Sequence, residues 1–77
     1  NPFNPVTMLS YDVPFEMNVS LGIYDLRGRL VDELVEGLRN RGRYEISWNA
    51  GKNASGVYIV KLVAGNTIKL QKVMLVK

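Results

Sequence analysis

The side chains that most often carry enzyme chemistry are scarce in this 77-residue sequence, which has no cysteine and no histidine. Their absence excludes thiolate nucleophiles, disulfides, the usual zinc sites and an imidazole general base. Asp32 and Glu33 are adjacent carboxylates, but neighbours in a strand point to opposite faces and cannot act on one bond. No phosphate-binding loop, metal-spaced carboxylate set or nucleophile elbow occurs. We therefore expect no enzyme, no cofactor and no metal site.

Aromatic side chains are the other group with binding potential. An exposed cluster of them could stack sugars or bases. Here the aromatic residues alternate with polar neighbours, which favours burial in a small core that no disulfide supports. The residues concerned are Tyr11, Tyr24, Tyr44, Tyr58 and Trp48.

The formal net charge of +3 includes five arginines between Arg27 and Arg43. Such a basic stretch could indicate an anionic partner, nucleic acid or lipopolysaccharide. Acidic residues lie within the same stretch, however, and interspersed charges are typical of a solvated face. We expect no nucleic-acid partner.

Length and hydropathy indicate one small domain. No apolar run approaches the roughly 20 residues that cross a bilayer, so we expect no membrane insertion. The sequence starts at "NPFNP", without an initiator methionine or a signal-peptide pattern. We expect it to be the C-terminal piece, residues 1–77, of a longer secreted protein.

Two segments in the first third alternate apolar and polar residues, as half-buried strands do. The first covers residues 7–13 and stops at Pro14, and the second lies in "MNVSLGIYD". The side chains predicted to point inward are Thr7, Leu9, Tyr11, Val13, Val19, Leu21 and Ile23. Gly28, in "DLRGR", supplies the positive φ that a tight hairpin corner needs.

A third strand, plain or bulged, is expected from Leu30 to Gly37. The spacing of its apolar residues would also suit one face of a helix, but the run is shorter than a typical helix. A polar loop follows, and a fourth strand then places Tyr44, Ile46 and Trp48 on one face. The eight-residue loop "NAGKNASG" reverses the chain.

The last two strands are "GVYIVKLVA" and "TIKLQKVMLVK", which a turn at Gly65 and Asn66 connects. The former places Tyr58, Val60 and Leu62 on one face. The latter has apolar residues on both faces, which predicts burial on both sides or a bulge that switches the facing. Together these features predict an all-β, antiparallel β-sandwich of six to seven short strands.

Four stretches in order, "NPFNPVTMLSYDVP", "VSLGIYDLRGRLVDELVEG", "ASGVYIVKL" and "KVMLVK", carry a family resemblance. Together they resemble the C-terminal sorting domain of cargo proteins for the type IX secretion system, over nearly the whole chain. The first half also resembles the immunoglobulin-like (Ig-like) domain of the flagellar hook-capping protein, which implies an Ig-like sandwich. That family typically has aspartate-glycine after the tryptophan, whereas this chain has Asn49 and Ala50.

The sorting-domain resemblance implies a domain that directs an upstream cargo, part of the same chain, through the outer membrane. Its expected partners are the components of the type IX translocon and a sortase. The sortase commonly removes the domain and attaches the cargo to anionic lipopolysaccharide. The expected location is the periplasm in transit, and then the cell surface or the extracellular space.

The resemblance also implies which residues are recognised. They are Gly56, Val57, Tyr58, Lys72, Val73, Met74, Leu75, Val76 and Lys77, with a structural turn at Asp25, Gly28 and Arg29. A terminal edge strand can serve physically as a recognition signal, because a receptor can add a strand to its unpaired backbone groups. Each residue also has a purely structural interpretation: backbone geometry for the glycines, packing for Tyr58, and protection against aggregation for Lys72.

Two other functions fit the same sequence. One is an Ig-like accessory or carbohydrate-binding module of a secreted hydrolase. The other is a structural Ig-like domain of a hook-capping-type assembly protein. The upstream sequence and the presence of translocon genes in the genome would distinguish these from a sorting domain.

Overall fold

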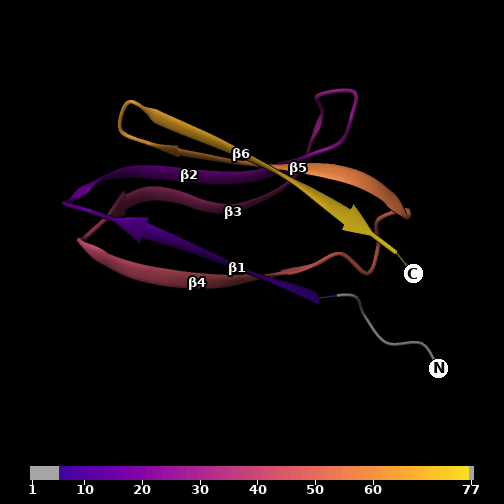
Figure 1. Ribbon diagram of the computed structural model, residues 1–77, viewed down its shortest axis with the longest axis horizontal. Helices are drawn as coiled ribbons and strands as arrows, with labels where there is room; N and C mark the ends of the chain where they lie inside the picture. The colour runs from indigo at the N-terminus through magenta and orange to yellow at the C-terminus, as the bar shows by residue number, and fades with distance from the viewer. Residues whose placement is uncertain (1–5, 77) are drawn as a thin grey trace.

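The computed structural model describes residues 6–76, which form six β-strands in two antiparallel sheets (Figure 1). The smaller sheet pairs β1 (Val6–Val13) with β4 (Gly42–Asn49). The larger sheet has the order β3 (Leu30–Arg39), β2 (Met17–Tyr24), β5 (Gly56–Ala64) and β6 (Thr67–Leu75). The predicted all-β sandwich is confirmed, with six strands in the described part of the chain.

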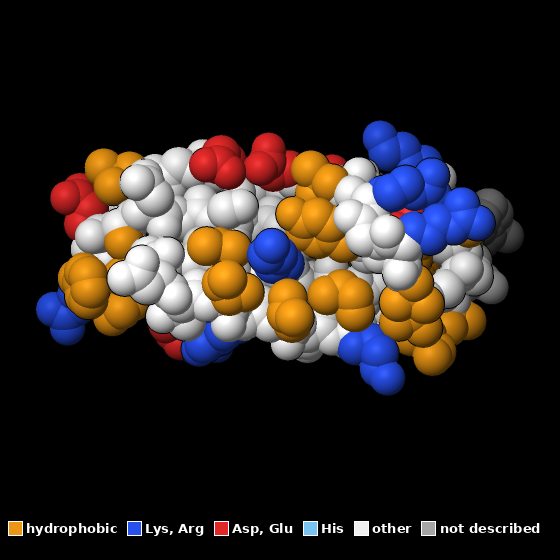
Figure 2. Space-filling model, turned by 90° about the horizontal axis from the view of Figure 1, so that it is seen from above, with side chains coloured by type: hydrophobic (Ala, Val, Ile, Leu, Met, Phe, Trp, Pro, Cys, Tyr) orange, Lys and Arg blue, Asp and Glu red, His pale blue; other side chains and the backbone are white. Residues whose placement is uncertain are grey.

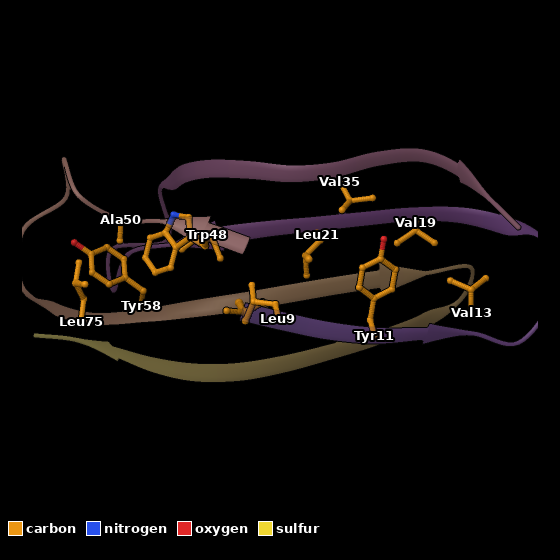
Figure 3. Packing of buried hydrophobic residues seen from close by; sticks show 12 residues of the cluster. Leu9, Tyr11, Val13, Val19, Leu21, Val35, Trp48, Ala50, Tyr58 and Leu75 are labelled. Carbon is orange, nitrogen blue, oxygen red and sulfur yellow. The ribbon is translucent and has the colours of Figure 1, made fainter. Parts of the chain in front are cut away.

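The core lies between the sheets, and alternate residues of each strand supply it. Figure 3 shows Leu9 and Tyr11 of β1 and Leu21 of β2 pointing into the same interior. The inward residues predicted for β1, β2 and β5 are confirmed, with Thr7 and Leu62 only half-buried. The buried members of that set are Leu9, Tyr11, Val13, Val19, Leu21, Ile23, Tyr58 and Val60.

Aromatic rings fill much of this core, as their alternation predicted. The Trp48 and Tyr58 rings meet edge to face, with centroids 5.5 Å apart. Tyr11 and Tyr44 are paired across β1 and β4 and stack with their centroids 5.3 Å apart. Such contacts between rings add stability beyond the apolar area that they bury. The interpretation of these aromatics as core residues is confirmed for Tyr11, Trp48 and Tyr58, which are all buried. Tyr44 packs half-buried against the core. For Tyr24 the interpretation is wrong, because this residue lies on the outer face of the larger sheet.

The segment that could have been a helix is strand β3, with a bulge. Its pairing with β2 shifts register between Leu21 and Gly22 and again between Ile23 and Tyr24. The predicted end at Gly37 is wrong, because Gly37 pairs with Val19 and the ladder continues to Arg39. The following loop shrinks to residues 40–41, and the later loop is likewise shorter than predicted, at residues 50–55.

The prediction for the last strand is wrong in both of its forms. β6 pairs with β5 in a single register from Thr67 to Leu75, without a bulge. Its apolar residues are not buried on both sides, since Ile68 and Leu70 are 60% and 67% exposed. β6 is an edge strand, and one of its faces is uncovered. None of residues 6–76 forms a helix that could span a membrane.

Leu75 and Met74 provide a direct test of how β6 faces the core. Leu75 is 5% exposed and Met74 is 68% exposed, although they are adjacent. Leu75→Ala should lower the free energy of unfolding by about 2–4 kcal/mol through the cavity it leaves. Met74→Ala should change it by less than about 0.5 kcal/mol. Urea denaturation of both variants measures this, and equal losses would contradict the assigned facing.

Candidate functional site

The pairing of the strands brings the two predicted recognition segments and the predicted structural turn to one end of the sandwich. Tyr24, just before the predicted corner, pairs with Ile59 of β5. Ile59 in turn pairs with Lys72 of β6. The β2–β3 corner, the start of β5 and the end of β6 therefore lie together, at the right of Figure 1.

The carboxylate of Asp25 organises the corner at this end. Its Oδ1 accepts hydrogen bonds from the backbone N–H groups of Arg27 and Arg29, at 2.9 and 3.0 Å. Its Oδ2 accepts one from Nε–H of Arg29 at 2.9 Å. Gly28 has a φ of 84°, which a residue with a Cβ adopts only under strain. The predicted structural turn at Asp25, Gly28 and Arg29 therefore has a defined geometry.

These hydrogen bonds lower the pKa of the Asp25 carboxyl below its ordinary value of 3.8. The backbone N–H of Arg29 contributes most, and partial desolvation opposes it. The Arg29 side chain and the backbone N–H of Arg27 lower the pKa further. Hydrogen bonds to the charged form favour that form, so the corner is most stable when Asp25 is ionised.

The segment Gly56 to Tyr58 divides between the two faces of the sheet. Gly56 has a φ of 154° and open space around it, so its backbone angle and not crowding favours glycine. Val57 pairs with Met74 on the outer face. Tyr58 is buried, and its hydroxyl donates to the carbonyl oxygen of Ala54 at 2.6 Å. The tyrosine thus anchors the β4–β5 loop from inside.

The terminal stretch divides in the same way. Val73 and Leu75 face the core, where Val73 pairs with Tyr58. Lys72 and Met74 lie on the opposite face, toward solvent. Val76, just beyond the strand, is 73% exposed. Lys77 lies outside the described residues.

Hydrophobic side chains gather on the outer face of the four-stranded sheet, with basic side chains among them and at one end (Figure 2). Lys61 interrupts them and lies over the ring of Tyr24, with Nζ 5.7 Å from its centroid. β3 adds exposed Glu33 and Glu36 to the larger sheet. The apolar residues of β5 and β6 on this face are Val57, Ile59, Val63, Ile68, Leu70 and Met74.

Sequence reasoning missed Ile68 and Leu70 as surface residues. They belong to the same side of the strand as Lys72, and a lysine can mark a solvent-facing side of an edge strand. Lys72 was therefore the signal in the sequence that this side of the strand faces solvent.

A second feature that the sequence did not reveal is the partner of Trp48. The indole Nε1–H donates to Oδ2 of Asp32 at 3.0 Å, which satisfies a polar group that is otherwise buried. Glu33, by contrast, is exposed on β3, and the predicted separation of the two carboxylates is consistent with this. Among residues 6–76, no three acidic side chains lie close enough to hold a metal ion.

The geometry defines a small β-sandwich with an uncovered edge strand at its C-terminal side. A family model, the secretion system C-terminal sorting domain, matches residues 1–77. The chain belongs to this family, and its function is that of a C-terminal sorting signal for type IX secretion, which implies export to the cell surface or the extracellular space. No curated protein and no solved structure gives a significant match. The match supports neither the accessory-module nor the hook-capping alternative.

Asp25→Asn tests the corner through its pH dependence. Because the pKa of Asp25 is lowered in the folded state, its contribution to stability is present above the ordinary pKa of 3.8. It is lost as the pH falls through the folded-state pKa. The wild type should therefore exceed the variant in free energy of unfolding at pH 7, and the difference should shrink toward pH 2. A difference that stays constant from pH 7 to pH 2 in urea denaturation would contradict this assignment.

Proposed function

We propose that the export machinery reads the outward side chains and the free backbone edge at the end of β6. Recognition by secretion machinery is what membership in the family implies. The observation that carries the proposal is that Lys72 and Met74 are exposed to solvent, although their neighbours Val73 and Leu75 pack in the core. The same strand can therefore stabilise the fold through its inward side chains and present its outward side chains to a receptor.

The other predicted recognition residues act in two ways. Val57 pairs with Met74 and extends the outer surface, and Val76 prolongs it past the strand. Gly56 and Tyr58 set the shape of the site from within, through the backbone angle of Gly56 and the Tyr58 hydrogen bond to Ala54. We include Lys77 in the recognised stretch on the family resemblance alone.

The backbone of β6 offers a second means of recognition. Among the described residues it pairs only with β5, so its other edge has unpaired N–H and C=O groups. A translocon component can add a strand there and read alternate side chains. The sequence pattern of apolar residues with one lysine on the outer face gives such a strand specific contacts.

The remaining steps concern the whole secreted protein. Residues 1–77 form a single sorting domain joined to an upstream cargo, and the protein passes through the periplasm before it reaches the cell surface. A sortase acts on it there. The domain itself catalyses no reaction. We also propose that the sandwich is Ig-like, an expectation supported by its antiparallel strands and its buried tryptophan between two sheets.

Replacement of the outward residues of the terminal stretch tests whether the export machinery recognises them. Deletion of the last six residues is unsuitable, because it would remove Leu75 from the core. Instead, residues 1–77 are fused to a passive reporter with a periplasmic export signal in a type IX host, with Lys72→Glu, Met74→Ser and Val76→Ser combined. Surface delivery, measured by protease accessibility on intact cells, should fall by about tenfold or more, because these contacts are lost.

A matched control carries Met8→Ser, Leu38→Ser and Arg41→Glu, which alter exposed residues on other parts of the fold. It should be delivered like the wild type. Circular dichroism of both variant domains is used to check that they fold. Normal delivery of the terminal variant, or an equal loss in the control, would overturn the proposal.

Adjacent prolines test the free edge of β6. The N–H groups of successive strand residues point to opposite edges, so only one of Leu70→Pro and Gln71→Pro removes a bond to β5. The other variant should remain folded but should block an incoming strand. Its delivery should fall by about tenfold, whereas full delivery of the folded variant would contradict strand addition.

A further inference from the structure

A groove runs along the open side of the sandwich, between β1 and β6. It consists of two cavities of about 290 and 160 Å³, which share Leu62 and Lys69 in their linings. The floor is apolar and belongs to β2 and β5, through Leu21, Val60 and Leu62.

Strand edges border the groove. Among the described residues β1 pairs only with β4, and β6 pairs only with β5. Since β1 and β6 both line the groove, through Ser10 and Gln71 among others, their unpaired edges lie beside it. An extended segment in the groove would gain backbone hydrogen bonds along the eight residues of β1.

Lys69 is the charged side chain that the two cavities share, and Asp12 lines only the smaller one. Lys69 makes no ion pair within residues 6–76. Asp12, at the far end, lies 3.4 Å from Nη1 of Arg43 and is thereby balanced. The remaining lining is apolar or neutral, with Thr67 and Gln71 as its polar members on β6.

We propose that this groove accepts an extended acidic peptide segment of a partner protein, added to β1 as a third strand of the smaller sheet. Its inward side chains would be apolar over Leu62 and Val60, with one carboxylate facing Lys69. The added strand would cover the inner face of β6 that the two-stranded sheet leaves open. This surface is separate from the outward residues of the terminal stretch but adjoins the free edge of β6, which the proposed function assigns to the export machinery. The peptide titration tests the groove without any sorting step.

Two peptides of about eight residues, the length of β1, serve as probes. Both have valine at alternate positions and threonine between them, and one inward valine is replaced by glutamate in the first and by lysine in the second. Titration into residues 1–77 is followed by NMR. The glutamate peptide should bind about tenfold more tightly than the lysine peptide, with shifts concentrated in β1 and at residues 69–71.

Charge reversal sharpens the test. Lys69→Glu should invert the preference between the two peptides, because it reverses the charge that the inward side chain meets. Lys52→Glu, an exposed residue of the β4–β5 loop outside both cavities, should leave the preference unchanged and is the matched control.

Binding of neither peptide would overturn the proposal. The same holds for shifts confined to the outer face or to β3, and for a preference that Lys69→Glu does not change. Sedimentation of the domain without peptide measures its oligomeric state. A dimer that dissociates on Lys69→Glu would show that a second copy, and not an acidic partner, occupies the groove.

Discussion

The structure depends on a mismatch between its two sheets: two strands must cover four. β1 and β4 cover the inner faces of β2 and β5 and part of β3, where Val35 is buried. They do not extend over all of β6, where Thr67, Lys69 and Gln71 face the interior side and are still exposed. A domain of this size buries a limited share of its surface in any case, so the uncovered strand is where partners have access.

Strand alternation explains how β6 can hold the fold and also display residues for recognition, because its outward side chains lie on the face away from the smaller sheet. The end of β6 is fixed by aromatic packing: Tyr58 contacts Trp48 and pairs with Val73, and its hydroxyl holds the β4–β5 loop. Asp32 satisfies the indole N–H at that corner of the core. The outward residues of β6 contribute little to this packing and are free to be selected for recognition. In a sorting domain the signal must remain readable while the protein stays folded, and strand alternation meets both requirements.

Much of the fold could be predicted from alternation alone. The inward residues of β1, β2 and β5 followed from a period of two, and Gly28 correctly marked a corner. The end of β3 could not be predicted, because Gly37 is tolerated in a ladder that the pairing with β2 continues. The facing of β6 was not predicted, although Lys72, on the same side of the strand, was a signal. The pairing with β5 places Ile68 and Leu70 on the outer face, away from the smaller sheet.

For the site, residue types gave candidates, and only the register showed which of them share a face. Alternation places Met74 and Leu75, like Lys69 and Lys72, on opposite faces, but only the packing of the two sheets shows which of these faces is inward. The groove between β1 and β6 is likewise a property of the packed sheets and of no single motif.

Hydrogen exchange of individual amides is the most direct test of the central claim, that β6 is paired on one edge only. Amides from Ile59 to Ala64 lie between β2 and β6 and should all be protected. In β6 only alternate amides should be protected, those that bond to β5. Continuous protection along β6 would show that its edge is covered, and no protection would show that it is not paired; either result would contradict the account.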